Sequence, residues 1–146
     1  HPLMDEYMVP VCSPEYAERH QLLDNPDNLN HCRLLHDRQA WGYDSDTDEW
    51  CSWARQAGIS LDGCQSSMGF DRSDLAIIAA INHAGVAMGR KNLVRQRLER
   101  NELVEPFPGK AVRCNQRYYM ATLPHRQCPK IQAFIEWISA QAKEID

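Results

Sequence analysis

Two short polar segments each follow a predicted strand, and each places an aspartate beside an arginine. Their candidate binding residues are Asp37, Arg38, Trp41, Asp71, Arg72 and Ser73. An arginine can bind a carboxylate through two hydrogen bonds, and an aspartate can accept hydrogen bonds from an ammonium group. Because ligands of open α/β sheets bind outside the carboxyl ends of the strands, these segments predict a site for a small zwitterion.

The second segment also opens a predicted helix, whose free N–H groups and dipole favour an anion such as a carboxylate. A purely structural alternative stays open at both segments. Asp71 or Ser73 would then cap the helix, and Asp37 and Arg38 would pair on the surface. The residue pattern alone favours this structural alternative over the ligand site.

Motifs for catalysis are missing from the sequence. It contains no G-x-S-x-G, no phosphate-binding loop and no G-x-G-x-x-G, and its 6 histidines are scattered. The sequence therefore does not predict an enzyme. A hydrolase that uses Cys64 or Ser73 remains a rival interpretation, and it would need a base within reach of the nucleophile.

The 6 cysteines are irregularly spaced, and neither C-x-x-C nor H-x-x-x-H occurs. A metal site would need such a pair to present two ligands from one turn. We therefore expect reduced thiols, mostly buried as small apolar side chains, and neither a metal nor a cofactor.

The 146 residues are 43% hydrophobic and 25% charged, which is the composition of one soluble globular domain. A net charge of -4 without a long basic run gives this chain no source of DNA affinity of its own. No apolar stretch is long enough to cross a membrane, and the first residues do not resemble a signal peptide. We expect a cytoplasmic protein.

Apolar runs that suit strands alternate with segments of helical periodicity. Strands are expected at 7–12, 31–36, 63–70, 86–88, 103–104 and 113–123, and helices at 13–19, 48–57, 71–84, 91–100 and from 129 onward. This alternation predicts an α/β fold with a largely parallel sheet.

Helical spacing also predicts which side chains are buried. Trp50 and Trp53 are expected in the core, and Gly58 is expected to end their helix. The next helix should bury one face and end at Gly85, and the last helix should bury an apolar stripe against a sheet or a partner. The residues of these two faces are Leu75, Ile78, Ala79 and Asn82, and Ile131, Phe134, Ile135 and Ile138.

Four segments of the sequence belong together in this order: 6–14, which reads EYMVPVCSP; 71–90, which contains AGVAMGR; 101–107, which reads NELVEPF; and 129–137, which reads PKIQAFIEW. Together they resemble the effector-binding domain of LysR-type transcriptional regulators. The third is similar to the family's G-x-L-V-x-P-F, with Asn101 where glycine is usual.

The resemblance implies a periplasmic-binding-protein-like fold of type II, with two α/β subdomains and a small effector between them. It implies a hinge strand at 1–11, the second subdomain at 12–116, and a returning hinge strand with the C-terminal helix of the first subdomain at 117–146. Homo-oligomers and DNA binding through an N-terminal winged helix-turn-helix are implied too. We expect that helix-turn-helix and the rest of the first subdomain to lie outside this chain.

Within the family, the segments LLHDRQAW at 34–41, TDEW at 47–50 and GFDRSDLA at 69–76 resemble the regulators of D-serine catabolism. This implies D-serine as the effector, with its carboxylate on Arg38 or Arg72 and its ammonium on Asp37 or Asp71. Tyr118 or Tyr119 on the hinge strand would also contribute. The alternatives are a solute-binding protein of the same fold and a chain that binds nothing and serves oligomerisation.

Overall fold

A computed structural model describes residues 1–39, 48–62, 68–124 and 128–145 of the chain. The chain divides into two compact units. The larger unit comprises Tyr7–Val112, and the smaller unit comprises His1–Glu6 together with Arg113–Asp146.

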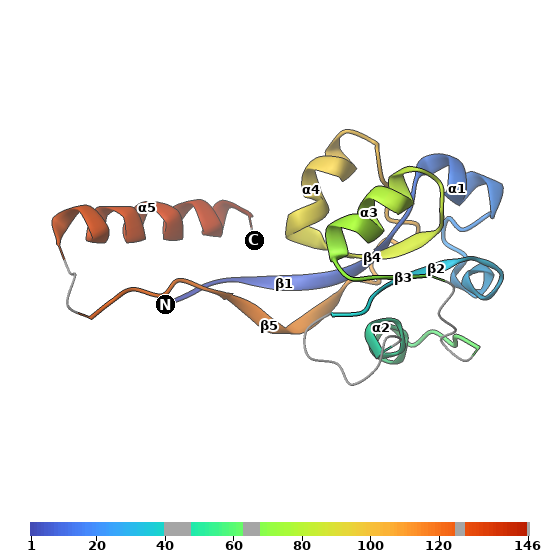
Figure 1. Cartoon of the computed structure of the whole chain (residues 1–146), viewed down its shortest axis with the longest axis horizontal. Helices are drawn as coiled ribbons and strands as arrows, with labels where there is room; N and C mark the ends of the chain where they lie inside the picture. Colours follow the sequence, from blue (N-terminus) through green and yellow to red (C-terminus); the bar gives the residue numbers. More distant parts are fainter. Residues whose placement is uncertain (40–47, 63–67, 125–127, 146) are drawn as a thin grey trace. The chain divides into compact units, whose positions relative to one another are not determined.

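The larger unit contains a mixed sheet with strand order β3-β2-β4-β1 and helices between successive strands (Figure 1). Its elements, in chain order, are β1 (Pro2–Val11), α1 (Pro14–Arg19), a 3-10 helix (Pro26–His31), β2 (Leu34–Asp37), α2 (Asp48–Ala57), β3 (Met68–Phe70), α3 (Ser73–Ile81), β4 (Val86–Arg90) and α4 (Lys91–Glu99). The α/β alternation predicted from the sequence is confirmed.

The sheet is parallel only in part. β2 pairs in parallel with β3 and with β4, as expected. β1 instead runs antiparallel to β4, with Met8 opposite Arg90 and Val11 opposite Ala87. An antiparallel strand beside otherwise parallel strands is common in such folds, and the apolar pattern of a strand does not encode its direction.

Helix α3 packs on the sheet through small residues. Ala76 and Ala80 are buried, whereas Leu75 and Ile78 of the predicted face are 43% and 49% exposed. The prediction of that face was wrong because α3 is apolar on nearly all sides, so its spacing could not choose a face. The core formed here consists of Val9, Val11, Leu35, Ala76, Ala80, Ala87, Val94 and Leu103.

The end of α3 also differs from expectation. The left-handed residue after the helix is His83, with φ 64°, and not Gly85. Gly85 is needed for another reason, because a Cβ atom there would lie 2.4 Å from the carbonyl oxygen of Arg33. That carbonyl accepts the N–H of Val86 at 2.9 Å, so it cannot move freely.

Helix α2 lies on the opposite side of the sheet from α3 and α4 (Figure 1). Trp50 and Trp53 are fully buried, as predicted, with ring centroids 5.8 Å apart. The indole Nε1 of Trp50 donates to the carbonyl of Leu35 at 3.0 Å, and that of Trp53 donates to the carbonyl of Lys110 at 2.8 Å. Gly58, with φ 71°, ends the helix as predicted.

Helix α1 begins as its sequence predicts. The Ser13 hydroxyl accepts the N–H of Tyr16 at 3.1 Å, and Pro14 takes the first helical position. The following strand is shorter than expected, because residues up to His31 form the 3-10 helix and β2 begins only at Leu34.

The smaller unit contains the first residues of β1, β5 (Val112–Tyr119, whose first residue belongs to the larger unit) and α5 (Pro129–Ile145). β1 and β5 are hydrogen-bonded neighbours. Asp5 pairs with Arg113 at 2.6 Å and with Arg117 at 3.0 Å. The predicted apolar stripe of α5 is only partly buried, and Phe134 is 55% exposed.

The cysteines follow the expectation only in part. Cys12, Cys32, Cys114 and Cys128 carry reduced thiols, whereas Cys51 is disulfide-bonded, so the prediction of reduced thiols was wrong at Cys51. Burial raises the pKa of the Cys12 thiol to about 12, which makes it unreactive. Within the described ranges, no helix is long and apolar enough to cross a membrane.

Candidate ligand-binding site

The two polar segments singled out in the sequence meet at one edge of the larger unit's sheet. β2 and β3 are parallel, and Asp37 lies opposite Phe70 in their register. The N–H of Arg38 donates to the carbonyl of Phe70 at 2.9 Å. The carboxyl ends of both strands, and with them Asp37 and the start of α3, therefore lie side by side.

The side chain of Arg38 crosses β3. A Cβ atom at Gly69 would lie only 2.2 Å from Nε of Arg38, so the guanidinium occupies the space above this glycine. The absence of a side chain at position 69 is what allows Arg38 to reach over the neighbouring strand.

Arg72 is exposed and bound to its own helix. Its Nε donates to Oδ1 of Asp74 at 3.0 Å, and its Nη2 contacts Oδ2 of the same carboxylate. Arg72 is the N-cap residue of α3, and its side chain makes no capping hydrogen bond. The alternative in which Asp71 or Ser73 caps this helix is therefore not observed.

Asp37 does not form a surface pair with Arg38. It is 10% exposed, and its Oδ2 lies 3.6 Å from Nη2 of Arg90, the last residue of β4. Its Oδ1 accepts the N–H of Gln39 at 3.0 Å. The partner of Asp37 is thus a buried arginine on the neighbouring strand.

A second carboxylate reaches the same arginine from α2. Oε1 of Glu49 lies 3.2 Å from Nη1 of Arg90, and these side chains are 2% and 5% exposed. Burial raises the pKa of Glu49 from 4.5 to about 7, and the charge of Asp37 acts in the same direction; Arg90 and the backbone N–H of Asp37 oppose this rise.

Sequence reasoning missed both Glu49 and Arg90. Two signals could have revealed them. Glu49 lies four residues before Trp53, on the face of α2 predicted to be buried, and Arg90 ends a strand that is otherwise apolar. A charge in either position needs a buried partner of opposite sign.

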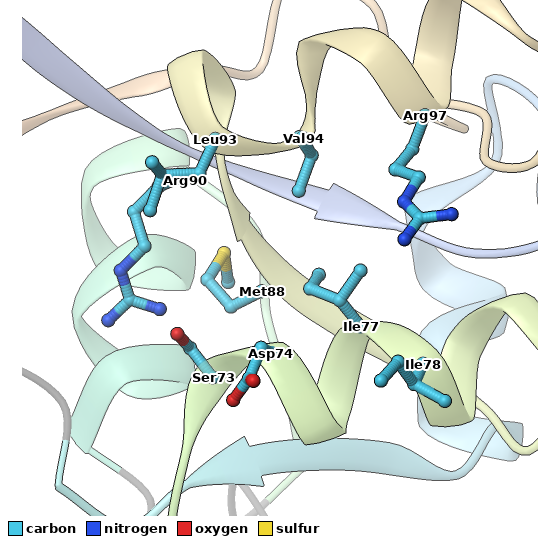
Figure 2. A pocket seen from close by; sticks show the side chains of 9 residues that line it. All are labelled: Ser73, Asp74, Ile77, Ile78, Met88, Arg90, Leu93, Val94 and Arg97. Carbon is cyan, nitrogen blue, oxygen red and sulfur yellow. The ribbon is translucent and has the colours of Figure 1, made fainter.

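A pocket of about 300 Å³ lies between α3 and α4 (Figure 2). Its walls are mainly apolar, with Ile77 and Val94 among them. The guanidinium of Arg90 and the hydroxyl of Ser73 lie at one end, and Arg97 lies at the other (Figure 2). Arg90 therefore lines this pocket and also pairs with the carboxylates of Asp37 and Glu49.

The remaining predicted residues lie elsewhere. The hydroxyl of Tyr118 donates to Oε2 of the buried Glu6 at 2.8 Å, within the smaller unit, and Tyr119 is exposed. Trp41 and Cys64 fall outside the described residues. The structure thus brings together Asp37, Arg38 and the 71–73 segment, and it places the tyrosines in the other unit.

A part-parallel α/β sheet with polar residues gathered at its strand ends defines a ligand-binding domain of the periplasmic-binding-protein-like type. The family comparison agrees, because the model of the LysR substrate binding domain matches residues 1–143. The chain belongs to this family of LysR-type regulator domains.

Two curated relatives from Escherichia coli strain K12 are similar to the chain. The HTH-type transcriptional regulator DsdC is 61% identical over 143 residues, which are 98% of this chain and 46% of the relative. The glycine cleavage system transcriptional activator is 31% identical over 140 residues, which are 96% of this chain and 44% of the relative. The chain thus spans less than half the length of these relatives.

Solved structures show the same fold. The effector domain of the regulator AmpR from Pseudomonas aeruginosa matches with a TM-score of 0.76 and 25% identity, covering 98% of this chain and 65% of that one. The AmpR effector-binding domain from Citrobacter freundii matches with a TM-score of 0.73 and 22% identity, covering 99% and 67%.

Proposed function

We propose that the chain is the effector-sensing domain of a LysR-type regulator that responds to a small amino acid, with D-serine as the first candidate. The regulator would control transcription of a gene for D-serine catabolism. The chain itself is proposed to bind a ligand without chemical turnover, in keeping with relatives that are named as transcriptional regulators.

The observation that carries this proposal is the meeting of the two polar segments at one sheet edge. Asp37 and Phe70 are opposite each other, so an anionic and a cationic group of one small molecule can be bound from adjacent loops. Asp37 is proposed to take the ammonium group. Arg38 or Arg72 is proposed to take the carboxylate, aided by Ser73 at the start of α3.

Two kinds of support favour an amino acid. The second relative is named as a transcriptional activator of the glycine cleavage system, and glycine is a small amino acid. The segments at 34–41 and 69–76 of this chain resemble regulators of D-serine catabolism. Trp41, Asp71, Tyr118 and Tyr119 remain predicted contributors to the site.

Regulation would act on DNA in the cytoplasm through an N-terminal winged helix-turn-helix carried by the whole regulator. Binding at the effector site would shift a homo-oligomer between two arrangements on its operator. The exposed Phe134 and Trp137 on α5 support association of this chain, because neighbouring apolar side chains on a surface favour contacts.

The test is calorimetric titration of the 146-residue chain with D-serine, L-serine and glycine. The same titrations would be made on a chimera in which the chain replaces the matching 143 residues of DsdC. We expect binding selective for D-serine that is lost in Arg38→Ala or Arg72→Ala and kept in Arg95→Ala, a control on the exposed face of α4. Absence of binding in both proteins would refute D-serine as the effector.

A further inference from the structure

Arg90 is shared by two carboxylates in a nearly dry environment. Its two terminal nitrogens lie 3.2 Å from Glu49 and 3.6 Å from Asp37. When both carboxylates are ionised, the three side chains carry one negative charge in excess. Water screens charges poorly at such buried positions. The excess negative charge therefore lowers the stability of the fold unless a proton or a cation neutralises it.

Other titratable and charged groups lie on the elements around Glu49. On β2, the buried His36 packs against Trp50 of α2 with ring centroids 6.5 Å apart. Arg38 extends over Gly69 on β3, and on α3 the charges of Arg72 and Asp74 cancel each other. Among the described residues, Arg90 is the cation that lies within 3.6 Å of both carboxylates.

Glu49 is also imperfectly satisfied. Neither of its carboxylate oxygens has a hydrogen-bond partner of good geometry among the described residues, although Oε1 is ion-paired with Arg90 and the backbone N–H of Asp37 also stabilises the ionised form. The cluster can lose its excess charge in two ways. Glu49 can take up a proton, or a cation can come to Asp37, which is the more exposed of the two carboxylates.

We infer that Glu49 is a specificity-determining residue of this site. Its negative charge acts through the shared Arg90 and makes Asp37 select ligands that carry an ammonium group. Binding of such a ligand then expels a proton from Glu49; the carboxyl O–H bond breaks and the proton passes to the buffer. This inference rests on the proposed function only in placing the ligand at Asp37. Glu49 is a positioning residue, because it acts through Arg90.

The size of the effect follows from the fraction of Glu49 that is ionised. If the ligand requires the ionised form, its apparent affinity is reduced in proportion to that fraction. With a pKa of about 7, the ionised fraction rises about tenfold between pH 6 and pH 8. Affinity for an ammonium ligand should therefore tighten about tenfold over this range, whereas affinity for a purely anionic ligand should weaken.

The experiment measures dissociation constants of the 146-residue chain at pH 6, 7 and 8 for three probes. D-serine carries both charges, ethanolamine lacks the carboxylate, and D-glycerate has a hydroxyl in place of the ammonium. We expect D-serine and ethanolamine to bind about tenfold more tightly at pH 8 than at pH 6. Glu49→Gln should make this profile flat, and Glu49→Asp should restore a pH dependence.

Glu99→Gln is the matched control, because Glu99 is an exposed partner of Arg95 on α4, and it should keep the native profile. Far-UV circular dichroism verifies that each variant is folded. An unchanged pH profile in Glu49→Gln would overturn the inference, as would D-glycerate binding as tightly as D-serine.

Failure of the proposed effector is distinguishable from failure of this inference. If D-serine does not bind at any pH, the D-serine assignment falls, and a ¹³C carboxyl NMR titration of Glu49 with ethanolamine decides the remaining question. A pKa of Glu49 that falls when ethanolamine is added supports the charge coupling. A pKa that does not change refutes it.

Discussion

Replacing Glu49 by glutamine should change how the stability of the chain depends on pH. The folded chain holds the pKa of Glu49 at about 7 instead of 4.5, so between these pH values it binds a proton that the unfolded chain releases. Glu49 therefore contributes stability that is fully present below about pH 4.5 and is lost as pH rises through about 7. At 1.36 kcal/mol per pKa unit, the loss is about 3 kcal/mol.

The assay is urea denaturation at several pH values, followed by far-UV circular dichroism. Relative to the native chain, Glu49→Gln should gain about 3 kcal/mol in free energy of unfolding between pH 4.5 and pH 8. Glu99→Gln removes an exposed carboxylate from α4. Its free energy of unfolding should differ from that of the native chain by an amount that hardly changes with pH. If the free energies of unfolding of the native chain and of Glu49→Gln differ by the same amount at every pH, Glu49 does not titrate as the buried cluster requires.

Three other substitutions test local features. Ser13→Ala removes the N-cap of α1 and should cost about 1–2 kcal/mol in thermal or urea unfolding; an unchanged midpoint would contradict this. Gly85→Ala forces a methyl group against the carbonyl of Arg33 and should cost about 1–3 kcal/mol, whereas a neutral result would show that this strand can move. Tyr118→Phe removes the hydroxyl that donates to the buried Glu6 and should cost about 1–3 kcal/mol in free energy of unfolding; an unchanged urea midpoint would argue against that hydrogen bond.

The fold was predictable where short-range signals act alone. The serine and proline at the start of α1, the tryptophan spacing of α2 and the glycine after it each specify a local conformation, and the structure confirms them. The face of α3 was not predictable, because its sequence, SDLAIIAAI, offers apolar residues on all sides. Only the sheet decides that the small Ala76 and Ala80 pack inward, and the sheet is assembled from distant segments.

The candidate site was predictable only in part. The positions of Asp37 and Arg38 beside the start of α3 follow from the rule that strand ends carry ligand-binding loops. The partner of Asp37 did not follow, because Arg90 lies more than fifty residues away and is brought near only by the pairing of β2 with β4. Sequence spacing shows which residues can share a loop, and it does not show which charges from different strands meet.

The buried indole of Trp50 also gives the site an optical reporter. Its Nε1 hydrogen bond ends on Leu35, two residues before Asp37 on the same short strand, and its ring lies edge to face with Trp53. Any shift of β2 on ligand binding would lengthen or bend that bond and change the near-ultraviolet dichroism and emission wavelength of the tryptophan pair. Trp137 is 57% exposed, so it emits at longer wavelength and can be separated by an external quencher. The occupied and empty states of the sheet edge can thus be followed without attaching a dye.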